Sequence, residues 1–253
     1  GHEEMLRRYF RQHKTKIMIN TFGFGYTLKS DLLYNISHIS GGTFSFIPDS
    51  GILANILIQA VSNFLTTAVY NPSFKITLNN GLKFKENGLD SLDFDINTIQ
   101  YGQDRNLRIE IDNSRQVSHD PDVVKKSFNV SLIMNGTTHQ TVDDSSIIDP
   151  IYKMRQDFRY KLSHLILYSR EKHNFSDTSY RDLVNTFIAE IESDRVASSD
   201  TYIVNILETV KGQLRESLNM TERGSRENWY EKWGKHYLLS LENAVSNELC
   251  NNF

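Results

Sequence analysis

The sequence predicts a mixed chain: an α/β segment with a partial, doubly wound parallel sheet, then an antiparallel β-sandwich, then a C-terminal helical bundle. Three observations support this prediction. Short apolar runs alternate with helical patterns over residues 1–68, apolar residues recur at every second position over 69–146, and a helical period dominates 147–253. We take these three ranges as the predicted domains.

Residues 1–68 show the order helix, strand, helix, strand, helix. We predict a helix over 3–13, a buried parallel strand over 16–22, a helix over 30–37, a strand over 43–47 and a helix over 51–65. Ser30 and either Asp49 or Ser50 are the expected N-caps, and Gly41-Gly42 is expected to end the second helix. The last helix has an apolar stripe, which consists of Ile52, Leu53, Ile56, Leu57, Ala60, Val61 and Phe64.

The middle segment alternates apolar and polar residues, as half-buried antiparallel strands do. Strands are predicted over 73–78, 92–96, 107–111 and 128–132. Turn sequences separate them, at Asn79-Asn80-Gly81, Asn87-Gly88 and Asn135-Gly136. The last segment is helical, with helices predicted over 150–170, 179–192, 201–218 (after Asp200) and 227–249.

The composition is typical of a protein with an ordinary apolar core and a small net charge. The 253 residues include 28 Lys plus Arg and 31 Asp plus Glu, and 39% are hydrophobic. A nucleic-acid-binding domain needs a basic excess to neutralise phosphates, so we expect no nucleic-acid partner. No apolar run approaches the roughly 20 residues of a membrane span, so we expect none.

Cysteine usage and the N-terminus favour an intracellular, cytoplasmic location. Cys250 is the only cysteine, which excludes a disulfide framework. The N-terminus is charged and lacks the apolar core of a signal peptide. Random placement of this much Asn, Ser and Thr would produce about three or four glycosylation sequons. Five occur, at Asn35, Asn129, Asn135, Asn174 and Asn219.

Two stretches carry a family resemblance. The segment Ile19-Asn-Thr-Phe-Gly-Phe-Gly25, the helix from Ser30 and Gly41-Gly-Thr-Phe-Ser-Phe-Ile-Pro-Asp49 resemble the C-terminal half of a von Willebrand factor A (vWA) domain. Trp233-Gly-Lys-His-Tyr-Leu238 and Cys250-Asn-Asn-Phe253 resemble the vWA/Hint-associated, Vwaint-like region. The resemblance implies a non-enzymatic protein-interaction scaffold.

The resemblance also implies a metal site that this sequence does not contain. The ligands of the family's metal-ion-dependent adhesion site would all precede Gly1. We therefore expect no metal or other cofactor here, and a Mg²⁺ or Ca²⁺ ion would belong to the missing half of the vWA domain. Strands without the centre of their sheet expose apolar faces and an unpaired edge, so the expected protein partners include that missing half.

Two other functions stay open at this point. The chain could be the substrate-recruiting or scaffolding part of a ubiquitin-ligase or autoprocessing protein whose catalytic domain lies elsewhere. The other function is that of a cation-dependent adhesion protein, whose metal ligands could come only from the missing half of the vWA domain.

No catalytic, cofactor-binding or metal-binding residue is predicted. Gly23-Phe24-Gly25 lacks the third glycine of a dinucleotide-binding turn, because Leu28 occupies that position. Ser50 lacks a nucleophile elbow, because Pro48 stands where glycine is required. We interpret the following as solvated turn residues: His119, Asp120, Asp122, Asp143 and Asp144.

Four further features receive structural interpretations. We expect His236 to be partly buried with one hydrogen bond, and Cys250 to be a structural thiol. Trp229, Trp233 and Tyr237 recur at helical spacing, which indicates core packing. The basic and aromatic run 6–11 is interpreted as a solvated helix face.

Overall fold

The computed structural model describes two compact units. One combines residues 1–59 with 149–253, and the other comprises residues 60–148. The structure describes residues 1–13, 17–79, 81–112, 128–134, 136–140, 149–172, 179–220 and 228–249. The two ends of the sequence therefore share one unit, and the domain boundaries expected after residues 68 and 146 stay a prediction.

The first unit contains a small parallel sheet. Its N-terminal elements are α1 (His2–His13), β1 (Thr21–Phe24), α2 (Ser30–Ser40), β2 (Phe44–Ile47) and the start of α3 (Leu53–Leu65), whose residues from Ala60 onward belong to the other unit. β1 and β2 pair in parallel, with Thr21 opposite Phe44, and α2 packs on both strands. Gly41 ends α2 in the left-handed conformation (φ 77°), as predicted. The predicted order of elements is therefore confirmed.

The first strand begins later than predicted. β1 starts at Thr21, and residues 17–20 have no regular structure. Side chains bind the backbone there: the Ile19 amide donates to Ser40 Oγ (3.1 Å), and Asn20 Oδ1 accepts from the Thr43 amide (2.9 Å). Gly23 consequently lies inside the strand, where a Cβ would stand 2.7 Å from Leu28 Cδ1.

The predicted apolar stripe around α3 is only partly buried, because three of its seven residues are exposed. Ile56 is buried, but Leu57, Val61 and Phe64 are 43%, 56% and 55% exposed. An apolar stripe on a helix normally faces a core, and these three residues do not. Helical periodicity identified the apolar face, but its neighbours leave about half of each of these side chains exposed, even where the Phe64 ring lies beside that of Tyr70 with centroids 6.5 Å apart.

The rest of the first unit is helical. Its elements are α5 (Pro150–Lys172), α6 (Ser179–Ser193), the 3₁₀ turn η1 (Ala197–Ser199), α7 (Thr201–Thr209), the π-helical turn η2 (Val210–Leu214), α8 (Arg215–Ser217), the π-helical turn η3 (Tyr230–Gly234) and α9 (Lys235–Ser246). The predicted helices over 150–170 and 179–192 are confirmed. Phe44 and Phe46 of β2 belong to the same apolar core as these helices, so a separate helical bundle stays a prediction.

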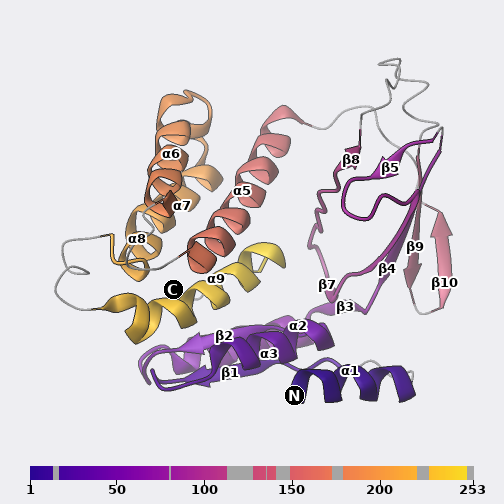
Figure 1. Cartoon of the computed structure of the whole chain (residues 1–253), viewed down its shortest axis with the longest axis horizontal. Coiled ribbons are helices and arrows are strands. Elements are labelled where there is room, and N and C mark those ends of the chain that lie inside the picture. Colours follow the sequence, from indigo (N-terminus) through magenta and orange to yellow (C-terminus); the bar gives the residue numbers. More distant parts are fainter. Residues whose placement is uncertain are drawn as a thin grey trace. The chain divides into compact units, whose positions relative to one another are not determined.

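The second unit is antiparallel. Its strands are β3 (Thr67–Tyr70), β4 (Ser73–Leu78), β5 (Lys83–Phe84), β6 (Ser91–Asp95), β7 (Thr98–Gln100), β8 (Ile111–Asp112), β9 (Phe128–Met134) and β10 (Thr137–Gln140). Four form a sheet in the order β10-β9-β4-β6, and two ribbons pair β3 with β7 and β5 with β8 (Figure 1). The antiparallel pairing is confirmed, whereas the face-to-face packing of a sandwich stays a prediction.

One predicted strand is largely absent from this unit. Over 107–111, only Ile111 is in a strand, and the preceding residues have no regular structure. The alternation there still has a packing role, because Ile109 and Ile111 contact the small core of Leu78, Leu82 and Phe84. Across the described residues, no helix is both long and apolar enough to cross a bilayer.

Candidate functional site

Helix α9 presents a buried polar face to the parallel sheet. His236, Ser240 and Asn243 are separated by four and then three positions, so they lie on one side of the helix. Their exposed fractions are 1%, 8% and 3%. Figure 1 shows α9 between α5 and the two strands, and it packs on both α5 and β2. We call these three residues the α9 polar face.

Two members of the α9 polar face bind the backbone of β2. The Phe46 amide donates to Ser240 Oγ, and the Phe44 amide donates to Asn243 Oδ1. The donor–acceptor distance is 3.3 Å in both hydrogen bonds. The later helix residue contacts the earlier strand residue, so α9 runs antiparallel to β2. Both amides are buried, and an unpaired buried amide would cost about 1–3 kcal/mol.

The third member, His236, is bonded through both ring nitrogens. Nε2 lies 3.1 Å from the carbonyl oxygen of Tyr26, and Nδ1 lies 2.7 Å from Ser30 Oγ. A carbonyl can only accept, so Nε2 carries the proton and Nδ1 accepts from the Ser30 hydroxyl. Burial lowers the pKa of His236, which favours this neutral ring.

Two predictions about these residues are wrong. His236 is fully buried with two hydrogen bonds, not partly buried with one. Ser30 is not the N-cap, because Lys29 occupies that position and Ser30 is the first residue of α2, with its hydroxyl bonded to His236. A Ser–His pair is also the start of a nucleophilic site, but Ser30 is only 3% exposed and a substrate could not reach it.

A second polar contact joins α9 to α2 and α5. The Tyr34 hydroxyl donates to Glu242 Oε2 (2.6 Å), and Ser163 Oγ donates to Glu242 Oε1 (3.4 Å). Glu242 is 5% exposed. Burial, together with the neighbouring Glu242 carboxylate, raises the pKa of Tyr34, so this hydroxyl stays protonated and keeps donating.

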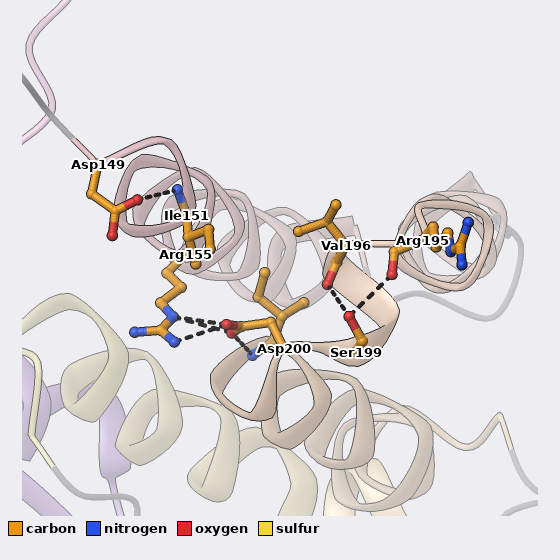
Figure 2. A network of polar contacts seen from close by, with 8 residues as sticks. Asp149, Ile151, Arg155, Arg195, Val196, Ser199 and Asp200 are labelled. Carbon is orange, nitrogen blue, oxygen red and sulfur yellow. Dashed lines mark hydrogen bonds and ion pairs between the residues drawn. The ribbon is translucent and has the colours of Figure 1, made fainter.

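An ion pair joins α5 to the start of α7 (Figure 2). Arg155 Nε lies 3.1 Å from each Asp200 carboxylate oxygen, and Nη2 lies 2.8 Å from Oδ2. Asp200 also accepts from the Ile203 amide (3.2 Å), which confirms its predicted position before the helix. The Arg155 hydrogen bond holds the pKa of Asp200 below its usual value.

Three other features that the sequence singled out have the surroundings expected of structural residues. Asp49 Oδ1 accepts from the Gly51 amide (2.7 Å) just before α3. Tyr237 is fully buried against Trp233, with ring centroids 5.1 Å apart, which supports the predicted core packing. On α1, Arg7, Arg8 and Arg11 are exposed, as expected for a solvated face.

Some candidates lie outside the described residues. They are Asn80, His119, Asp120, Asp122, Asn135, Asp143, Asp144, Asn174 and Cys250. Over the described ranges, no three His, Cys, Asp or Glu side chains gather as a metal site would require. No residue is therefore assigned to a metal ion.

Comparison with known proteins finds a family model that matches the C-terminal part of the chain and a solved structure with a similar fold. Residues 200–253 match the family model described as "VWA / Hh protein intein-like" (Vwaint). The fold resembles a solved structure, the von Willebrand factor type A protein from Catenulispora acidiphila, with a TM-score of 0.55 and 12% identity over 95% of this chain. The chain spans 61% of that protein's length. No curated protein sequence matches significantly.

These findings confirm the resemblance that the sequence suggested. The Vwaint match begins at Asp200, the residue that pairs with Arg155, and it includes the whole of α9. At 12% identity the structural likeness establishes the fold and not an activity.

Sequence reasoning missed the α9 polar face. The stripe that it found, through Trp229, Trp233 and Tyr237, is aromatic and reaches α9 only at Tyr237. The signal that could have revealed the other face is the recurrence of polar residues at 236, 240 and 243, which places them on one side of the helix beside the apolar residues Leu238, Leu239 and Leu241.

Proposed function

We propose that the chain is a non-enzymatic protein-interaction scaffold that offers the free side of β1 to a polypeptide partner. The observation behind this proposal is the alternation along β1. Thr21 and Gly23 are buried against the unit's own core, whereas Phe22 and Phe24 are 38% and 61% exposed. Two aromatic side chains at alternate strand positions form an apolar surface that a partner would bury favourably.

The backbone of β1 supports the same proposal. The amide of Thr21 donates to the carbonyl oxygen of Thr43, just before β2 (2.9 Å), and the amide of Gly25, just after β1, donates to that of Ile47 (2.8 Å). Backbone groups alternate in direction along a strand, so those of Phe22 and Phe24 point away from β2. Within the described part of the chain, no other strand pairs with that edge. An edge of this kind binds an added strand through main-chain hydrogen bonds.

We further propose that the partner continues the parallel sheet, as the N-terminal half of a vWA-type domain would. This partner would supply a parallel strand beside β1 and apolar side chains over Phe22 and Phe24. Any metal ligands would come from the partner. The chain itself would contribute geometry and no chemical step.

The test compares two exposed apolar residues of the first unit. Phe24→Asp places a charge on the β1 surface, and Leu183→Asp places one on α6, where Leu183 is 44% exposed. Quantitative pull-downs from the source cells should show proteins that the wild type and the Leu183 variant capture equally. The Phe24 variant should lose at least about tenfold of that capture, since a desolvated charge at an interface costs 1.4 kcal/mol or more.

A photo-crosslinker at position 24, followed by peptide mapping, then identifies the partner segment. Capture that is equal for all three proteins would contradict the proposal. A crosslink to a second copy of this chain would show that β1 mediates self-association instead of binding a different polypeptide.

The second candidate is a recruiting or scaffolding part of an autoprocessing or ubiquitin-ligase protein. The family description "VWA / Hh protein intein-like" over residues 200–253 favours the autoprocessing version. Cleavage and conjugation assays on the parent protein, with and without these residues, distinguish it from the first. A rate that does not change on deletion would exclude this candidate.

A further inference from the structure

The two edges of the parallel sheet differ. At β1 the outward edge is free of other strands in the described part of the chain. At β2 the amides of Phe44 and Phe46, which point away from β1, donate to Asn243 and Ser240 of α9. A neighbouring strand would need these same two donors.

The match between α9 and β2 is one of spacing and chemistry. Ser240 and Asn243 are three helix positions apart, about 4.5 Å along the axis, and Phe44 and Phe46 are two strand positions apart, about 6.6 Å. Flexible side chains can span this difference, and both oxygens reach 3.3 Å from their amides. Apolar residues at 240 and 243 would pack well against Phe44 and Phe46 but would leave both amides unpaired. Helix packing alone therefore does not account for these polar residues.

His236 fixes the position of α9 along the strand. The centroid of its ring lies 5.4 Å from the centroid of the Phe46 ring, and its two hydrogen bonds hold it to Tyr26 and Ser30. A shift of α9 by one turn would break these bonds and both backbone contacts together. Buried polar pairs of this kind select one register.

We propose that α9 is an intramolecular edge cap, which occupies the outward amides of β2 and so closes that edge to strand addition. The cap goes beyond the binding role proposed for β1, since it acts at the opposite edge of the sheet. Edge strands that lack such protection pair with other chains.

The test removes both oxygens in the full chain with Ser240→Ala/Asn243→Ala. Amide hydrogen exchange is measured at Phe44 and Phe46, and at Ser45 and Ile47, which face β1 in the parallel register. Exchange at Phe44 and Phe46 should accelerate about five- to tenfold, the effect of one net hydrogen bond, while Ser45 and Ile47 change little. A labelled peptide of residues 19–26, the β1 sequence, should bind the double variant more tightly than the wild type.

Two variants serve as controls. Ser246→Ala/Asn205→Ala removes the same side chains at exposed positions, and Ser240→Thr keeps the hydroxyl at the capping position. Both should behave as the wild type does. If the double variant does not fold, Ser240→Ala and Asn243→Ala are measured singly, each with its own amide as the readout.

Three results would overturn the edge cap. Exchange that rises equally at all four amides would show that α9 only stabilises the core. Exchange that stays unchanged at Phe44 and Phe46 would show that the side chains do not protect them. Equal peptide binding by the double variant and the wild type would show that the edge was never closed.

Discussion

Gly234 lies against the backbone of Ser217, so closely that a Cβ on Gly234 would stand 2.1 Å from the Ser217 carbonyl oxygen. Both residues are buried, and they belong to segments that contact each other, η3 and α8. The contact also explains the glycine in the family-like run Trp233-Gly-Lys-His, because no other residue allows this approach.

Gly234→Ala should lower the free energy of unfolding by about 2–3 kcal/mol, because the clash is with backbone and cannot be relieved by a side-chain rotation. Gly212, in the other π-helical turn, is the matched control, since a Cβ there meets nothing within 4 Å. Gly212→Ala should be neutral or stabilising by up to about 1 kcal/mol. Urea unfolding followed by tryptophan fluorescence reports on the first unit, because Trp229 and Trp233 are the only two tryptophans. Equal effects of the two substitutions would refute the close-packing argument.

Asp200 has two roles that substitutions can separate. Asp200→Asn keeps an oxygen for the Ile203 amide but removes the charge that binds Arg155, whereas Asp200→Ala removes both. The alanine variant should therefore be less stable than the asparagine variant by about 1 kcal/mol, the cost of a lost N-cap. If the two variants unfold at the same urea concentration, the cap does not contribute.

The lowered pKa of Asp200 also predicts a pH dependence. The folded state binds the proton more weakly than the unfolded state, so stability from this group is present above the unfolded pKa and is lost as the pH falls. Between about pH 5 and pH 3 the wild type should lose stability more steeply than Asp200→Asn. Urea unfolding at several pH values measures both slopes, and parallel curves would exclude this linkage.

His236 should make the first unit sensitive to mild acid. Its pKa is lowered by burial, with Lys235 lowering it further and Glu231 and the Tyr26 carbonyl opposing the shift. The unfolded state therefore takes up the proton first, and stability should fall as the pH drops below about 6.5, by at most 1.36 kcal/mol per pH unit. His236→Gln should flatten this slope, whereas His164→Gln, at an exposed position, should not. A slope unaffected by either change would mean that other groups cause it.

Tyr34→Phe should destabilise the first unit more than Tyr168→Phe does. Tyr34 donates to the buried Glu242 carboxylate (2.6 Å), whereas Tyr168 shares a neutral hydrogen bond with Ser179 (3.2 Å). Hydrogen bonds to charged groups contribute about 1.5–3 kcal/mol and neutral ones about 1 kcal/mol. Thermal unfolding followed by circular dichroism compares the stabilities of the two variants. A larger loss of stability for the Tyr168 variant would contradict the stronger hydrogen bond assigned to Tyr34.

Much of the local structure was predictable because it depends on neighbours in the sequence. The alternation of Phe74, Ile76 and Leu78 predicted β4, and Pro150 and Asp200 marked the starts of two helices. The glycines after α2 predicted its end. These signals come from backbone sterics and periodicity, which act over a few residues.

The burial of α3 and the extent of β1 were not predictable in the same way. Periodicity shows which side of α3 is apolar, but only the neighbouring elements decide whether that side is covered. Ile17 begins an apolar run that looks like a strand, yet a strand needs a partner, and β2 pairs only from Thr21 onward.

By itself the sequence determined the order of elements, the turn glycines and the family resemblance, since these follow from local periodicity and motif spacing. Only the tertiary structure decided that residues 1–59 and 149–253 share one core and that His236 binds Ser30 across 206 positions. Contacts between residues so distant in sequence have no local period. They exist because each buried donor on one segment must find an acceptor on another.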